Sequence, residues 1–89
     1  MEIEFSQNKA IWELIIRHHN GAQEIEPFFV DEIISLRGFA ETGEEGYTGL
    51  YNWLRIHHSK FFQKYVIDNA QNGVVIKIVK ALKKYFGIL

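Results

Sequence analysis

Residues 47–79 read YTGLYNWLRIHHSKFFQKYVIDNAQNGVVIKIV, and this stretch decides which fold the sequence predicts. Its first part, residues 48–59, places two leucines and a tryptophan at helical spacing. Its second part, residues 61–79, is rich in β-branched and aromatic residues, which favour strands. A polar segment ending in Asn-Gly divides that part and is typical of a hairpin turn. The stretch therefore predicts a helix that runs directly into a β-hairpin.

The segments on either side predict further helices. Upstream, Ser6 is a candidate N-cap for a helix over residues 7–19, which carries an apolar stripe and ends at an Asn-Gly pair. A brief strand can follow at residues 22–26. A second helix over residues 27–36 begins at a proline, which is harmless in a first turn. Downstream, residues 80–86 resume helical spacing and predict a short terminal helix.

These elements predict a winged helix-turn-helix fold of the α+β class, with three helices, a C-terminal hairpin as the wing and a short terminal helix. The chain of 89 residues has 47% hydrophobic and 15% aromatic residues, which fits one globular domain over residues 1–89. Three glycines and three glutamates in residues 38–46 predict a mobile acidic loop before the third helix.

Composition excludes several classes of protein. The chain has no cysteine, so it has no disulfide, no cysteine-based zinc site and no thiol nucleophile. Its acidic start does not resemble a secretory or transit peptide. Its apolar runs are too short to span a bilayer. We therefore expect an intracellular, cytoplasmic protein that does not enter a membrane.

Charge is divided unevenly along the chain. Residues 1–45 carry a net charge of −7 and residues 46–89 carry +6, which together give the overall −1. A basic face in the second half can attract phosphates or an acidic partner. The alternative is that the two halves neutralise each other where they pack together. The sequence leaves both interpretations open.

Catalysis and metal binding are not predicted. The pairs His18-His19 and His57-His58 are adjacent residues on expected helices, so the members of each pair point about 100° apart. They do not have the spacing of metal ligands. The acidic residues have no neighbouring nucleophile, and residues 43–46 lack the lysine and threonine of a phosphate-binding loop. We expect no enzyme activity, no catalytic residue, no metal and no cofactor.

The sequence GLYNWL at residues 49–54, followed by SKFF at residues 59–62 and the expected hairpin, resembles the LOTUS domain, also called the OST-type helix-turn-helix. The resemblance covers residues 47–86 and, through the terminal helix, points to the extended form. His57-His58-Ser59 stands where the family often has a proline. The resemblance implies a noncatalytic recognition module. Shorter members bind RNA, including G-rich RNA, and extended members dock the DEAD-box helicase Vasa in germ granules.

One set of candidate residues would bind a nucleic acid. Lysine and arginine near phosphates release counterions, and an exposed aromatic ring can stack on a base. The candidates lie on the third helix and the expected hairpin. They are Tyr51, Arg55, His58, Lys60, Lys64 and Lys77.

A second set would bind a protein partner. The helix at residues 27–36 is apolar around more than half of its girth, so part of it can remain exposed for docking. Together with the terminal helix it supplies the candidates Phe29, Ile33, Leu82, Lys83, Lys84 and Phe86. The isoelectric point of about 6.4 is low for a dedicated nucleic-acid binder.

The predicted partners are RNA or a protein such as a DEAD-box helicase, ahead of DNA, and the chain can be a monomer or a homodimer. The alternative is a small winged-helix DNA-binding protein or repressor of the phage or plasmid type.

Overall fold

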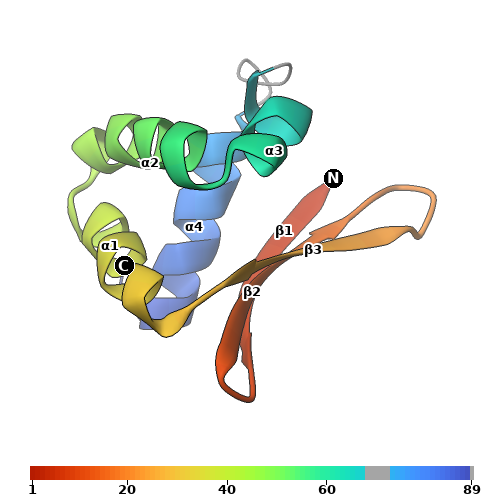
Figure 1. Ribbon diagram of the computed structural model, residues 1–89, viewed down its shortest axis with the longest axis horizontal. Coiled ribbons are helices and arrows are strands. Elements are labelled where there is room, and N and C mark those ends of the chain that lie inside the picture. Colours follow the sequence, from red (N-terminus) through yellow and green to blue (C-terminus); the bar gives the residue numbers. More distant parts are fainter. Residues whose placement is uncertain (68–72, 89) are drawn as a thin grey trace.

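The computed structural model describes residues 1–67 and 73–88. Its chain forms a β-sheet first and a group of helices after it (Figure 1). Three antiparallel strands have the order β1-β2-β3. In chain order the elements are β1 (Glu2–Asn8), β2 (Ile11–Arg17), β3 (Gln23–Phe28), α1 (Val30–Glu41), α2 (Glu44–His57), α3 (Ser59–Phe61), the π-helical η1 (Phe62–Ile67) and α4 (Val74–Phe86). The predicted α+β class is confirmed. The winged-helix arrangement is not confirmed, because the strands precede the helices.

The helix predicted for residues 7–19 is wrong, because this segment forms a β-hairpin. Lys9 and Ala10 make the turn between β1 and β2, and Lys9 adopts a positive φ of 58°. Along β2, alternate residues starting at Trp12 point to the same side of the sheet, and Leu14 stands opposite Phe5 of β1. The apolar residues of this segment fit both a helical and a strand period, and pairing with β1 selects the strand.

The strand predicted for residues 22–26 is confirmed and extends to Phe28 as β3. Pro27 therefore ends a strand and does not begin a helix, so the helix predicted for residues 27–36 starts and ends later, as α1. The first turn of α1 is fixed by Glu32, whose carboxylate accepts a hydrogen bond from the Phe29 N–H at 3.1 Å. This satisfies one of the N–H groups that a helix start leaves without a partner.

The acidic loop predicted for residues 38–46 is mostly helical. The helix α1 continues to Glu41 and α2 begins at Glu44, which leaves only Thr42 and Gly43 between them. Gly43 has a φ of 65°, a conformation that glycine adopts without strain. The third predicted helix, residues 48–59, corresponds to α2 and begins four residues earlier than expected.

The hairpin predicted for residues 61–79 is wrong, because its described residues are helical. Residues 68–72, which include most of the expected turn, lie outside the described residues. In α4, Val74, Ile78 and Leu82 recur every four residues and are buried, whereas Ile76 is exposed. Burial thus follows the period of a helix although the residues are β-branched. The terminal helix predicted for residues 80–86 is the second half of α4.

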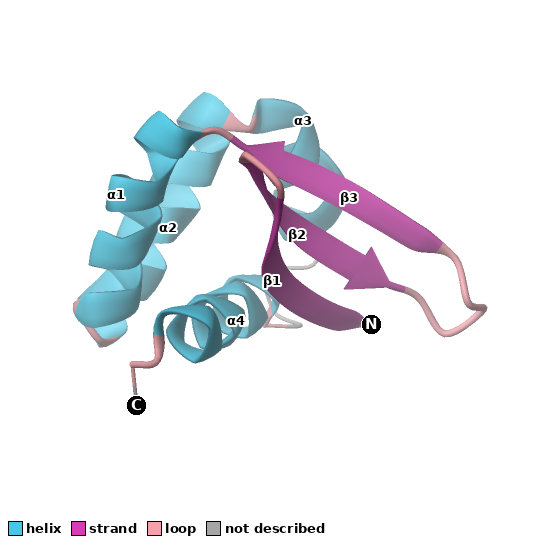
Figure 2. Ribbon diagram, turned by 90° about the horizontal axis from the view of Figure 1, so that it is seen from below, coloured by secondary structure: helices cyan, strands magenta, loops and turns pink. Residues whose placement is uncertain are grey.

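The core lies between one face of the sheet and the helices (Figure 2). Helix α4 packs along β1, and α1 and α2 pack against each other and against α4. The buried apolar residues are Phe5, Leu14, Ile16, Phe28, Leu36, Ala40, Leu50, Leu54, Phe61, Phe62, Tyr65, Val66, Val74, Ile78, Val79, Ala81 and Leu82. Strand alternation also turns Glu24 and Glu26 of β3 to this inner face, where they meet the helical half of the chain.

Candidate nucleic-acid interface

The inner face of β3 pairs the acidic half of the chain with the basic half. Glu24 accepts hydrogen bonds from Lys64 of η1 at 2.5 Å and from His18 at 2.9 Å. Glu26 lies 2.7 Å from His58, which follows α2. Some of the opposite charges of the two halves therefore neutralise each other where the halves pack together, which was the alternative to a basic binding face.

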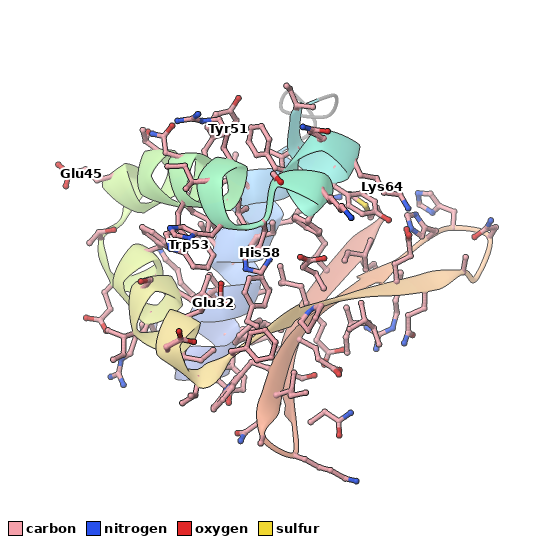
Figure 3. The ribbon with its side chains drawn as sticks, viewed as in Figure 1. Glu32, Glu45, Tyr51, Trp53, His58 and Lys64 are labelled. Atoms are coloured by element: carbon pink, nitrogen blue, oxygen red, sulfur yellow. The ribbon has the colours of Figure 1, made fainter. Side chains whose placement is uncertain are left out.

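His58 bridges two carboxylates from different elements. Its Nδ1 lies 2.7 Å from Glu26 of β3, and its Nε2 lies 2.7 Å from Glu32 of α1. The His58 side chain is 10% exposed and its ring lies against Phe28. It also lies against Trp53, as Figure 3 shows. Both ring nitrogens must donate to serve both carboxylates. This side chain is therefore occupied inside the protein and does not face a ligand.

The electrostatics of these two clusters follow from their contacts. Burial of the His58 ring opposes its protonation, but the hydrogen bonds to Glu26 and Glu32 outweigh burial and raise the pKa of His58. The hydrogen bond from Lys64, and then the one from His18, lower the pKa of Glu24. Glu24 is therefore ionised, and His58 is more readily protonated than a free imidazole.

A row of lysines follows the exposed side of α4. Lys77, Lys80 and Lys84 recur at intervals of three and four residues and therefore share one face of the helix. They line a groove of about 770 Å³ between α4 and β1. The opposite wall contains acidic residues of β1, among them Glu4, which pairs with Arg17 at 2.9 Å.

Two smaller hollows lie near the groove, and neighbouring spaces share lining residues. One of about 450 Å³ shares Lys77 with the groove and adds Lys64, Tyr65 and the two histidines that follow β2. The other, of about 210 Å³, shares Lys64 and Tyr65 and adds Lys60. We call the five lysines that line these three spaces the lysine track. They are Lys60, Lys64, Lys77, Lys80 and Lys84.

The structure brings together three of the six residues predicted to bind nucleic acid. Lys60, Lys64 and Lys77 belong to the lysine track. Tyr51 and Arg55 lie on α2 and line none of its three spaces. Tyr51 instead contacts Phe62 edge to face, and Figure 3 shows it on α2, well apart from Lys64.

Sequence reasoning missed Lys80 and Tyr65 and gave Lys84 a different role. The spacing of Lys77, Lys80 and Lys84 was a usable signal. It was hidden because residues 74–79 were assigned to a strand and residues 80–86 to a separate helix, so Lys77 was not expected on one helix face with Lys80 and Lys84.

The residues predicted to dock a protein do not form one surface. Leu82 is fully buried and Ile33 is partly buried. Phe86 is half-buried against the rings of Phe5 and Tyr85. Lys83 is half-exposed and Lys84 lies on the lysine track.

Phe29 is the docking candidate with a clearly exposed apolar side chain. It is 61% exposed, and its neighbours Val30 and Ile34 are 68% and 81% exposed. We call Phe29, Val30 and Ile34 the α1 apolar patch.

Across residues 1–67 and 73–88, no three histidine, aspartate or glutamate side chains are placed to hold a metal ion. No helix in the described part of the chain is both long enough and apolar enough to cross a membrane.

Comparisons of the chain with protein-family models, with curated proteins and with solved structures gave no match.

Proposed function

We propose that the protein is a noncatalytic recognition module that binds RNA along the lysine track. The observation that carries this proposal is the convergence of five lysines, from α3, η1 and α4, on three spaces that share lining residues. A continuous row of cations beside a groove fits a phosphate backbone better than a compact ligand. RNA is preferred to DNA because of the resemblance of residues 47–86 to the LOTUS domain.

Binding to this surface is expected to be moderate and sensitive to salt. Each lysine near a phosphate releases counterions, and this contribution weakens as salt rises. Carboxylates share the same spaces: Glu2 and Glu4 face the α4 groove, and Glu24 holds Lys64. The acidic residues reduce the local positive potential, so the protein should release RNA readily at moderate salt.

The test is a salt series with G-rich RNA, unstructured RNA and duplex DNA, measured by fluorescence anisotropy. If all five lysines contact a single strand, the logarithm of the binding constant falls against the logarithm of salt with a slope of about −3.5. The variant Lys80→Glu/Lys84→Glu should weaken binding at least about tenfold and make the slope shallower by about 1.4.

The matched control is Lys9→Glu/Arg55→Glu, which changes the net charge by the same amount away from the lysine track. It should change RNA affinity much less. Equal losses in the two variants would mean that net charge alone drives binding. Absence of binding to any of the three probes at low salt would remove the proposal, and preference for the duplex would favour the DNA-binding alternative.

A second candidate function is the docking of a protein at the α1 apolar patch. Its support is the exposure of three large apolar side chains at the start of α1, since contiguous exposed apolar surface often marks an interface. The LOTUS resemblance suggests a DEAD-box helicase of the Vasa type as the partner.

The docking proposal can be tested with a purified Vasa-type helicase. Ile34→Glu should abolish its capture by the protein without changing RNA affinity. Ile56→Glu places the same charge on another exposed isoleucine, on α2, and should leave capture intact. Unchanged capture by the Ile34 variant would contradict docking at this patch.

A further inference from the structure

Tyr65 presents a buried hydroxyl without a hydrogen-bond partner among the described residues. The residue is 8% exposed. The centre of its ring lies 5.2 Å from that of Phe61 and 6.1 Å from that of the stacked His18 ring. A buried hydroxyl that makes no hydrogen bond destabilises the folded protein, so most such groups in native structures have a partner. Its position in the middle of the lysine track suggests that a ligand supplies the partner.

The surroundings of Tyr65 favour an anion. Tyr65 lines both smaller hollows of the lysine track. The Lys64 ammonium lies 5.3 Å from the centre of the Tyr65 ring, and Lys77 lines the same hollow of about 450 Å³. Glu24 is the one carboxylate among the described side chains that line this larger hollow, so its two lysines exceed it in charge.

Glu24 currently occupies the groups that an anion would use. Its two oxygens bind Lys64 and His18, which are both next to Tyr65. An incoming anion therefore competes with Glu24 for the Lys64 ammonium. The Tyr65 hydroxyl is buried in the structure, so an anion reaches it only when the side chains around it shift.

We propose that Tyr65, Lys64 and Lys77 form a phosphate-binding site in this hollow, in which the Tyr65 hydroxyl donates a hydrogen bond to a phosphate oxygen and the two lysines supply the positive charge. This inference deepens the proposed RNA-binding function and rests on it for the source of the phosphate. A backbone phosphate and free phosphate share this chemistry, and the experiment below separates the two sources.

The deciding variant is Tyr65→Phe, which removes the hydroxyl and keeps the packing of the ring. It should weaken binding of a short oligouridine about tenfold, the effect of losing one hydrogen bond to a charged group. It should also raise the melting temperature of the ligand-free 89-residue chain, because the unpaired buried hydroxyl is gone. The salt dependence should stay unchanged, since no charge is lost.

Two further variants separate the proposed role from a purely structural one. Glu24→Gln removes the competing carboxylate charge and should strengthen binding of the same oligouridine several-fold. Tyr51→Phe removes a tyrosine hydroxyl outside the lysine track and should leave binding unchanged. Weaker binding in the Glu24 variant, or equal losses in the two tyrosine variants, would overturn the site.

Inorganic phosphate, titrated by calorimetry into the wild type and Tyr65→Phe, identifies the source. Loss of phosphate binding in the variant together with weaker RNA binding supports a site that accepts both free phosphate and a backbone phosphate. Weaker RNA binding alone means that the site recognises only the phosphates of an RNA strand. If the wild type binds phosphate through Tyr65 but binds no RNA, the proposed function fails while the site stands. If Tyr65→Phe changes neither ligand, the site is overturned whether or not RNA binds.

Discussion

Gly46→Ala is expected to lower the free energy of unfolding by about 3 kcal/mol, the upper part of the usual range for overpacking. A Cβ at Gly46 would lie 2.1 Å from the carbonyl oxygen of Phe39 and 2.9 Å from the Thr42 hydroxyl. The first of these is a backbone atom, so it cannot move without displacing α1. The absent side chain at Gly46 is what lets the first turn of α2 approach the end of α1.

The matched control is Gly38→Ala, in the exposed part of α1. A Cβ there meets nothing within 4 Å, and alanine favours a helix over glycine. This variant should raise the free energy of unfolding by about 0.5–1 kcal/mol. Urea unfolding followed by circular dichroism measures both changes. An unchanged free energy of unfolding in Gly46→Ala would contradict the close approach of α1 and α2 at this residue.

His58→Ala is the second change with a large expected effect. It leaves Glu26 and Glu32 facing the interior without a cation and removes a ring that packs on Phe28. The expected loss is about 3 kcal/mol in slightly acidic buffer, the lower end of the cost of breaking a buried pair, since both carboxylates keep some contact with water. His57→Ala changes the adjacent, exposed histidine and should cost much less.

The same cluster predicts how stability depends on pH. The pKa of His58 is raised in the folded protein above its ordinary value of 6.5. The folded state therefore holds a proton that the unfolded state releases, so the stabilisation is complete below pH 6.5 and is lost as the pH rises through the folded pKa. Asp31 lines the same surface hollow as His58 and adds a further negative charge nearby.

The control for this pH dependence is Glu26→Gln/Glu32→Gln. It removes the charges that raise the pKa, so the fall in stability above pH 6.5 should become smaller. Unfolding free energies measured by urea titration across neutral pH give the result. A wild-type stability that rises with pH in this range would contradict the charged bridge.

The elements that sequence reasoning predicted correctly are those whose signals are local. The strand at residues 22–26, the helix at residues 48–59 and the helical spacing after Lys80 are all found. The segment at residues 7–19 could not be assigned from its own pattern, because its apolar residues fit two periods. Pairing with Phe5 and its neighbours across the sheet decides between them, and pairing is a non-local property.

The expected hairpin failed for a related reason. Val74, Ile76 and Ile78 have the intrinsic preferences of a strand, but the core lies on one side of this segment only. A helix buries the consecutive residues Ile78 and Val79 together, whereas a strand would turn one of them away from the core, and this burial outweighs the local preference.

The candidate site was predictable only in part. The charge difference between the halves of the sequence indicated both a basic surface and an internal neutralisation, and the structure contains both. Lys64 belongs to both, because it neutralises Glu24 and is also part of the basic lysine track. Which cations face inward depends on the side of β3 that each glutamate occupies, and this requires the register of the sheet.

The composition of β3 also has a consequence for how the molecule behaves in a crowded solution. This strand pairs only with β2 within the described sheet, so its other edge has no strand partner there. Pro27 has no N–H to offer a new strand, and Glu24 and Glu26 would bring charge into any extended sheet. These residues therefore discourage edge-to-edge aggregation through β3.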